Sequence, residues 1–368
     1  DKAALAAERR GLAQIPPPPQ EGHGETMPLD RPDAWYATAQ ARHVADVIVS
    51  FQTPAGGWGK NQRRDGAPRK PGQAYVADNI SKFLSPGDYD IPHDPRWNYV
   101  GTLDNNATTT EMRFLVRVAA QAPGPEGDAY RASFLRGVRY LLDAQYPNGG
   151  WPQVWPLEGG YHDGVTYNDN AVALAAMTLS AAAVGRGDYA FVPRDVRAAA
   201  GEAAAKAVWV ILATQVRSGG VATIWAQQYD PLTLTPESAR NFEPPALASD
   251  ESADVLIFLM QQPDPSPAVV AAVHDAVAWL KAHALRDVAW TRTDRGRELV
   301  PSPGAGPIWA RYYDAGTGRP VFGDRDKSLH DDVADLSLER RNGYNWFDTS
   351  PQKALDAYAA WAKAHPGG

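Results

Sequence analysis

The sequence has no cysteine, no long apolar run and no excess of positive charge, and each absence excludes a class of function. Without cysteine, the 368-residue chain has no disulfide, thiolate metal ligand or thiol nucleophile, so any metal must bind oxygen or imidazole ligands. No uninterrupted apolar run approaches the roughly 20 residues that a membrane-spanning helix needs. The formal net charge of −7 argues against nucleic acid as a partner. We therefore expect a soluble protein that binds neither membrane nor nucleic acid.

The remaining composition is that of a folded protein with a short N-terminal extension. A hydrophobic content of 44% and a charged content of 21% are ordinary for a globular domain. Residues 1–31 are expected to form a short helix and a linker, because "QIPPPPQEGHG" cannot continue a helix. Residues 32–368 are expected to form a single folded domain. The start at Asp1 and the lack of cysteine fit an exported protein whose signal peptide has been removed.

Apolar residues recur at helical spacing along the body, whereas no series of alternating strands stands out. Asp33 is the expected N-cap of the first of these helices. Helices are expected over residues 34–51, 107–121, 129–145, 169–185, 194–214, 247–262, 267–284 and 351–364. Long segments rich in Gly, Pro, Trp and Tyr separate them. This pattern favours a mostly α fold with large functional loops.

An internal repeat predicts how the helices are arranged. The segments "QTPAGGW" (Gln52–Trp58), "QYPNGGW" (Gln145–Trp151) and "QVRSGGV" (Gln215–Val221) share Gln-x-x-x-Gly-Gly-apolar, and each follows a helical pattern. The glycines can end the helix, and the last residue can fill the adjoining core. Unrelated Gly-Gly turns would not share the glutamine. We therefore expect helical hairpins stacked around an axis, an (α/α)₃ toroid whose long loops form a cleft at one end.

Two of the loops place acids and amides at the start of a helix. Asp104 and Asn105 precede one helix, and Asp169 and Asn170 precede another. Simple N-capping explains one such pair. Two pairs, each with a spare oxygen ligand, favour a shared site, and carboxylate and amide oxygens suit Ca²⁺.

Basic and aromatic residues concentrate in two later loops. The segment "IWAQQYDPLTLTPESARNFEPPALASDES" holds Arg240, and "PIWARYYDAGTGRPVFGDRD" holds Arg311 and Arg325 among tyrosines and phenylalanines. Exposed surface or an internal salt bridge is the ordinary explanation for any single arginine, and Arg319 is left to it. Most of the aromatic residues are expected to pack between helices, and a few exposed ones would suit stacking on sugar rings.

Five motifs together resemble the family-10 pectate lyases, bacterial enzymes that cleave polygalacturonate. They are "TLDNNATTTEMRFL", "YPNGGWPQVWP", "TYNDNA", "WAQQYDPLTLTPESARNFEPPAL" and "ARYYDAGTGRPVFGDRD". The resemblance runs in order from about residue 34 to 364. The fold of the family is similar to the toroid that the repeat predicts. It implies a Ca²⁺-dependent enzyme that is secreted or periplasmic, with oligogalacturonate or polygalacturonate as its substrate. We expect a monomer.

The resemblance also implies roles for individual residues. Arg240 corresponds to the catalytic base, and Asp169 to the main calcium carboxylate, with Asp104 and Asn105 as its partners. The expected substrate-binding residues are Arg311, Arg325, Lys206, Tyr312, His162 and Asn170. Lys206 is explained equally well as an exposed lysine of an amphipathic helix.

The implied reaction is a β-elimination, in which the C5 proton is removed and the C4 oxygen is expelled. Ca²⁺ bridged to the substrate carboxylate would stabilise the developing negative charge, and arginines would hold uronate groups in bidentate contacts. An arginine base is physically demanding, because guanidinium has a reference pKa of about 12.5 or higher. Its charged form must be penalised by neighbouring cations and burial. Because the chain is acidic overall, we expect a cleft far more positive than the average surface.

Two other functions are compatible with parts of the sequence. A glycoside hydrolase on the same toroid would use Asp104 and Asp169 as an acid and base, at about 6.5–9.5 Å for an inverting enzyme. A non-catalytic uronate-binding module would need the arginines without any turnover. EDTA and the ultraviolet absorbance of an unsaturated product distinguish the lyase from both.

Overall fold

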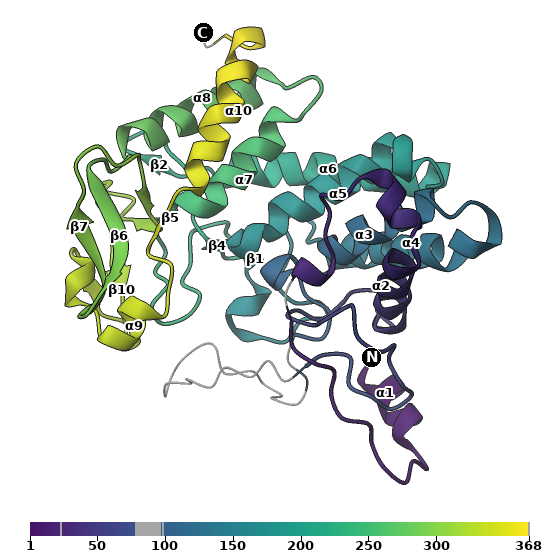
Figure 1. Cartoon of the computed structure of the whole chain (residues 1–368). Helices are drawn as coiled ribbons and strands as arrows, with labels where there is room; N and C mark the ends of the chain where they lie inside the picture. Colours follow the sequence, from purple (N-terminus) through teal and green to yellow (C-terminus); the bar gives the residue numbers. More distant parts are fainter. Residues whose placement is uncertain (23, 78–96, 98, 367–368) are drawn as a thin grey trace. The chain divides into compact units, whose positions relative to one another are not determined.

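The computed structural model describes residues 1–22, 24–77, 97 and 99–366 (Figure 1). The α-helices are α1 (Lys2–Arg9), α2 (Ala39–Ser50), α3 (Thr109–Ala120), α4 (Asp128–Ala144), α5 (Ala171–Val184), α6 (Arg194–Thr214), α7 (Ser249–Met260), α8 (Pro267–Ala282), α9 (Leu338–Asn342) and α10 (Ser350–Ala364). Helix accounts for 46% and strand for 12%, which confirms the predicted mostly α class.

The strands are short and pair only two at a time. They are β1 (Val165–Thr166), β2 (Arg217–Ser218), β3 (Val221–Ala222), β4 (Gln228–Tyr229), β5 (Leu247–Ala248), β6 (Val288–Thr293), β7 (Gly296–Pro301), β8 (Trp309–Ala310), β9 (Tyr312–Tyr313), β10 (Phe322–Gly323), β11 (Leu329–His330) and β12 (Phe347–Asp348). The antiparallel pairs are β1 with β4, β2 with β3, β5 with β9, β6 with β7, β8 with β12 and β10 with β11. Most of these strand pairs join two loops by backbone hydrogen bonds and so determine the conformation of the loops that follow the helices.

The chain divides into two compact units, which we describe separately. Unit 1 comprises residues 1–82, 92–163 and 174–207. In it α2, α3 and α4 pack against one another, as Figure 1 shows. Apolar positions of α3 such as Met112, Leu115 and Val116 are buried at this contact, as their helical spacing predicts. The helix α1 packs through Leu5 against Tyr75 and Val100.

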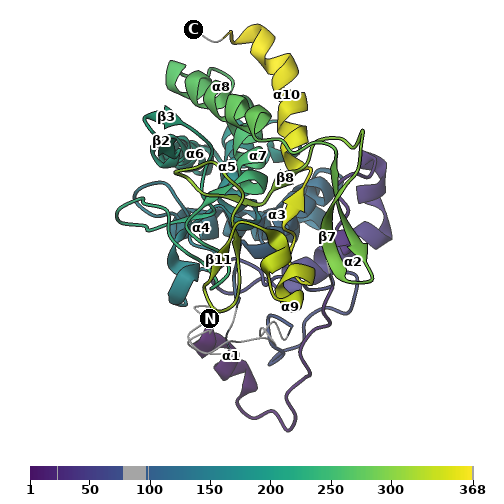
Figure 2. The same cartoon turned by 90° about the vertical axis from the view of Figure 1, so that its left-hand side faces the viewer.

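Unit 2 comprises residues 83–91, 164–173 and 208–368. Its helices α7, α8 and α10 pack against one another and lie side by side in both views (Figures 1 and 2). The hairpin β6–β7 was not predicted, although its strands pair in full register from Val288↔Pro301 to Thr293↔Gly296. Its residues are half-buried or exposed, so the sequence carries no clean alternation of apolar and polar residues.

The predicted helices all form, with their ends within a few residues of the expected positions. The predicted cap of the first one was wrong. Asp33 lies in a separate 3₁₀ turn at residues 33–37, and α2 begins after Thr38, whose hydroxyl accepts a hydrogen bond from the backbone N–H of Ala41. Thr38 is therefore the N-cap residue of α2, the role predicted for Asp33.

The glutamines of the repeat make the same contacts in all three copies. Each side-chain amide donates to a carbonyl of its own turn and to a carbonyl of the next long helix. The pairs are Gln52 to Gly56 and Ser133, Gln145 to Gly149 and Ala203, and Gln215 to Thr223 and Ala272, at distances of 2.8–3.0 Å. The glutamine thus joins every second helix, α2 to α4, α4 to α6 and α6 to α8, which is why it recurs.

The apolar residue of the third copy was assigned wrongly. Trp58 and Trp151 are buried, and their indole N–H groups donate to Ile48 and Leu141 of the preceding helix. Val221 is 67% exposed, and the corresponding bond, to Ile211 of α6, comes from the buried Trp225. A hairpin, β2–β3, is inserted before that tryptophan, so the spacing changes while the contact is kept.

A fourth copy lacks the Gln-Gly-Gly signal altogether. Trp309 is buried, and its indole N–H donates to the carbonyl of Leu280 in α8 at 2.8 Å. The tryptophan whose indole N–H bonds α2, α4, α6 or α8 is therefore the constant feature of the repeat.

Candidate active site

The two acidic turns share an unusual backbone. Residues 104–106 and 168–170 each form a short 3₁₀ turn whose central residue is left-handed, with φ of 50° at Asn105 and 51° at Asp169. Asn106 and Asn170 follow at 62° and 61°. Such values occur mainly at Asn and Asp. The structural equivalent of Asp169 is therefore Asn105. The sequence suggests Asp104 instead, which is one position earlier.

In unit 1, Asp104 is nearly buried and is paired with a lysine. Its Oδ2 lies 2.8 Å from Nζ of Lys60, which also lies 3.6 Å from the ring centre of Tyr99. The Tyr99 hydroxyl is 3.0 Å from Nε2 of His162. Asp104 makes no side-chain cap on α3, whose N-cap residue is Thr108. A carboxylate that does not cap the helix is available for another purpose.

In unit 2, Arg311 reaches the residues beside Asp169. Its Nη2 binds Glu251 at the start of α7 and lies 3.2 Å from Oδ1 of Asn168, while Nη1 lies 3.7 Å from Asp250. Burial raises the pKa of Glu251 to about 8; Arg311 opposes this shift, and the charges of Asp250 and Asp169 add to it. Arg311 therefore contacts two acids, Glu251 and Asp250, and the buried Oε2 of Glu251 has no hydrogen-bond partner among the described residues.

Arg240 is held by a buried carboxylate three residues later. Glu243 accepts from Nε of Arg240 at 2.9 Å and from Nη2 at 2.6 Å, and its Oε1 also accepts from the Tyr344 hydroxyl at 2.7 Å. Although burial pushes it upward, the charge and hydrogen bonds of Arg240 and the bond from Tyr344 hold the pKa of Glu243 at about 2. The Arg240 side chain keeps 30% of its surface exposed to solvent.

Three guanidinium groups surround the ring of Phe242. Their central carbon atoms lie 4.0 Å (Arg340), 4.8 Å (Arg240) and 5.5 Å (Arg325) from the ring centre. Arg325 is also paired with Glu339, at 2.9 Å from its Nε. Because Glu243 and Glu339 pair with two of these three arginines, the cleft expected to be far more positive than the average surface stays a prediction.

The other predicted substrate-binding residues are placed less favourably. Tyr312 is 0% exposed and His162 is 2% exposed, so neither offers a side-chain surface to a ligand in this structure. Lys206 is exposed on α6, and its carbonyl faces Gly149 of the repeat turn. Asn170 is half-buried. The other predicted residues of unit 2 are only partly buried. They are Asp169, Asn170, Arg240, Arg311 and Arg325.

The chemistry of the predicted calcium ligands fits a hard cation. Asp104 and Asp169 supply carboxylates, and Asn105 supplies an amide whose nitrogen donates to Asn61, leaving its own oxygen as an acceptor. No group of three His, Asp or Glu residues in the described part of the chain is close enough to hold a metal ion.

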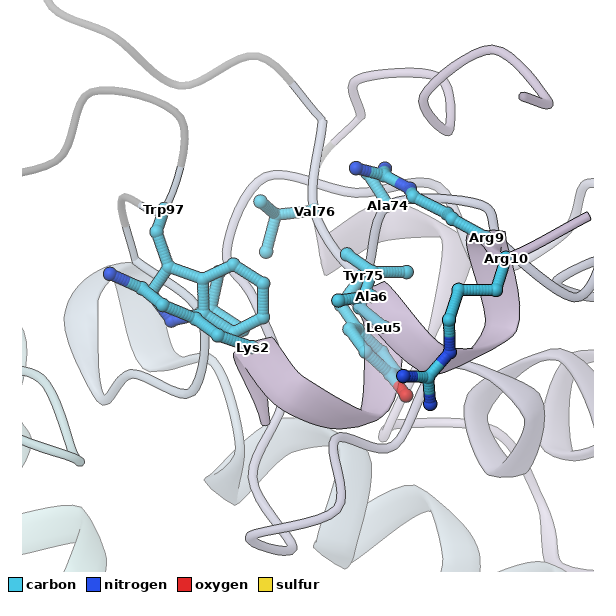
Figure 3. A pocket seen from close by; sticks show the side chains of 10 residues that line it. Lys2, Leu5, Ala6, Arg9, Arg10, Ala74, Tyr75, Val76 and Trp97 are labelled. Atoms are coloured by element: carbon cyan, nitrogen blue, oxygen red, sulfur yellow. The ribbon is translucent and has the colours of Figure 1, made fainter. Parts of the chain in front are cut away.

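A separate hollow of 510 Å³ lies beside α1 in unit 1 (Figure 3). Its lining includes Lys2, Arg9 and Arg10 together with Tyr75 and Trp97. None of the predicted site residues is among those that line it.

The comparisons with known proteins identify the class. The model of the pectic acid lyase family matches residues 52–355, so the chain belongs to this family and is a polysaccharide lyase. A solved structure of a family 10 polysaccharide lyase from Cellvibrio cellulosa is 30% identical, with a TM-score of 0.76, over 92% of this chain and 97% of that one. An aspartate-to-alanine mutant of that lyase, solved in complex with trigalacturonic acid, is 29% identical with a TM-score of 0.76, over 95% of this chain and 100% of that one. The comparison with curated proteins gave no match.

These likenesses confirm the family-10 resemblance, and they agree with the predicted helical toroid class. In the described part of the chain, no helix combines the length and apolarity needed to cross a membrane.

Several residues of the site were missed, although the sequence held a signal for one of them. Lys60 stands two positions after Trp58, as the predicted Arg311 stands two positions after Trp309, and each is paired with an acid. Aligning the four tryptophans would have predicted this equivalence. Glu243, Arg340 and Tyr344 carry no comparable sequence signal, because only the folded loops bring them together.

Proposed function

We propose that this lyase cleaves α-1,4-linked polygalacturonate by β-elimination and gives 4,5-unsaturated oligogalacturonates. The observation that carries the proposal is the group of arginines around Phe242, of which Arg240 and Arg325 keep 30% and 20% of their side chains exposed. A basic surface of this kind suits a chain of uronate groups, since guanidinium binds carboxylate in a planar, bidentate geometry. The family match supports the reaction type.

In this proposal Arg240 is the base that takes the C5 proton. The electrons of the C5–H bond form the C4–C5 double bond, the C4–O bond breaks, and water protonates the leaving oxygen. Glu243 fixes the guanidinium through two hydrogen bonds, so the group meets the sugar in one orientation. Arg325 and Arg311 are the proposed partners of substrate carboxylates.

We also propose that Asp104, Asn105 and Asp169 hold Ca²⁺, with Asp169 as the main carboxylate. When bound, Ca²⁺ supplies Lewis-acid stabilisation of the negative charge that develops on the substrate carboxylate. Lys60 neutralises Asp104 in this structure and so keeps an almost buried carboxylate in place. A monomeric, exported enzyme fits the proposal and the acidic composition of the chain.

The test follows absorbance of the unsaturated product on polygalacturonate, with and without EDTA, for the wild type and Arg240→Ala. We expect loss of absorbance in chelator, recovery with added Ca²⁺, and loss in the variant while oligogalacturonate binding persists. Reducing sugar released in EDTA without new absorbance would instead indicate a hydrolase. Binding without turnover by the wild type would indicate a binding module.

A further inference from the structure

Arg340 is a buried cation that the proposed reaction leaves unexplained. It is 4% exposed, its Nη2 donates to the carbonyl of Gly343 at 2.7 Å, and its Nε has no partner among the described residues. Its contact with a carboxylate, Glu339, is long at 4.0 Å, and Glu339 is half exposed. Burying a charge without a close counter-ion is unfavourable. The bond to Gly343 and the contact with the Phe242 ring offset only part of this cost, so the stability of the fold does not fully account for an arginine here.

The surroundings of Arg340 indicate what the charge acts on. Its guanidinium and that of Arg240 approach the same ring, Phe242, at 4.0 and 4.8 Å from the ring centre. Their central carbon atoms are therefore no more than about 9 Å apart, in surroundings that screen charge weakly. Burial lowers the pKa of Arg340; Glu339 opposes this shift, and Arg325 and Arg240 add to it. Like charges at this distance repel one another.

The other charged and titratable groups around this pair come from four segments. They are Glu243 beside Arg240, Arg325 before β11, Glu339 on α9, Tyr344 after α9, and Arg311, whose guanidinium carbon lies 5.0 Å from the centre of the Tyr344 ring. Glu243 stabilises the positive charge of Arg240 through direct contact, whereas the arginines destabilise it. The balance between Glu243 and Arg340 decides how firmly Arg240 holds its proton.

We propose that Arg340 is a positioning residue whose fixed charge makes Arg240 release its proton more readily, so that Arg240 can act as a base. The proposal rests on the proposed function, in which Arg240 removes the C5 proton. Neutral Arg240 accepts that proton and becomes a guanidinium, and the proton passes to water before the next turnover. Arg340 itself does not touch the sugar, because only 5% of its side chain is exposed.

The experiment measures kcat and KM on polygalacturonate as a function of pH, by product absorbance, for four proteins. These are the wild type, Arg340→Met, Arg340→Lys and Arg341→Gln. Methionine removes the charge and keeps an apolar side chain beside Phe242, and lysine keeps the charge. Arg341 is the matched control, because it is adjacent in sequence but donates to the carbonyls of Ala334 and Arg295.

We expect the rising limb of kcat against pH to move up by about one pH unit in Arg340→Met, which is about a tenfold lower rate on that limb. KM should stay near the wild-type value. Arg340→Lys and Arg341→Gln should leave the limb in place. The Tm of Arg340→Met should be no lower than that of the wild type, because the substitution removes an unpaired buried charge.

Three outcomes would overturn the proposal: an unmoved limb in Arg340→Met, an equal shift in Arg340→Lys, or an Arg340→Met protein that fails to fold. The last would show that the arginine is structural. Each is distinguishable from failure of the proposed function, which the wild type alone reveals by giving no unsaturated product.

Discussion

Replacing Arg64 by methionine should destabilise unit 1 strongly, because the substitution leaves a carboxylate buried without its cation. Arg64 and Glu111 have side-chain exposures of 0% and 2%. Arg64 donates to Oε1 of Glu111 from Nη2 at 2.7 Å and from Nε at 3.1 Å. Its Nη2 also donates to the carbonyl of Gly59, next to Lys60, at 3.2 Å. The pair thus fixes the turn that brings Lys60 to Asp104.

The expected size follows from burial. Removing one partner of a buried ion pair costs about 3–5 kcal/mol, because the remaining charge has lost its counter-ion. For a unit of about 190 residues, each kcal/mol lowers Tm by about 2–4 °C. We therefore expect Arg64→Met to lower the Tm of unit 1 by about 6–20 °C. Replacing both partners, Arg64→Met with Glu111→Leu, should recover most of this loss, since no unpaired charge remains.

Urea unfolding followed by tryptophan fluorescence measures these free energies, and Arg63→Met supplies the matched control. Arg63 is adjacent in sequence and makes a similar bidentate pair with Asp65, but the two side chains are 46% and 38% exposed. Its loss should change stability far less than the loss of Arg64, because solvent screens an exposed pair. Equal losses for Arg63→Met and Arg64→Met would refute the reasoning from burial. A double variant no more stable than Arg64→Met would do the same.

Two further predictions concern other parts of the fold. Trp225→Phe removes the indole bond to Ile211 and should destabilise unit 2 by about 2–4 kcal/mol in urea unfolding. Val221→Ala, at an exposed residue, should change the free energy of unfolding by no more than about 0.5 kcal/mol. Equal effects of the two substitutions would restore Val221 as the repeat residue. Because Arg240 and its neighbours hold the folded-state pKa of Glu243 at about 2, below the unfolded value, its contribution is complete above about pH 4.5 and is lost as the pH falls toward 2. Wild type should therefore lose about 3 kcal/mol more than Glu243→Gln between pH 5 and pH 2, and parallel pH profiles for the two proteins would contradict this.

The helices and the turns between them were predictable, because each depends on residues close together in the chain. The spacing of Met112, Leu115 and Val116 gives α3 its buried face, and the glycines after Gln52 and Gln145 mark where helices end. The repeat failed at Val221, where the inserted hairpin β2–β3 separates the glycines from Trp225, and it did not reveal the fourth copy, because no Gln-Gly-Gly precedes Trp309. The hairpin β6–β7 escaped prediction because neither of its faces is fully buried.

The candidate site was predictable in its residue types and not in their pairing. The sequence by itself determined that acids and amides precede two helices and that arginines concentrate in two loops, and the resemblance assigned them roles. Only the tertiary structure decided that Lys60 neutralises Asp104, that Glu243 holds Arg240, and that Arg340 approaches it across Phe242. The physical reason is that charge interactions depend on distance and burial, and residues 100 positions apart acquire both only when the loops that carry them fold against each other.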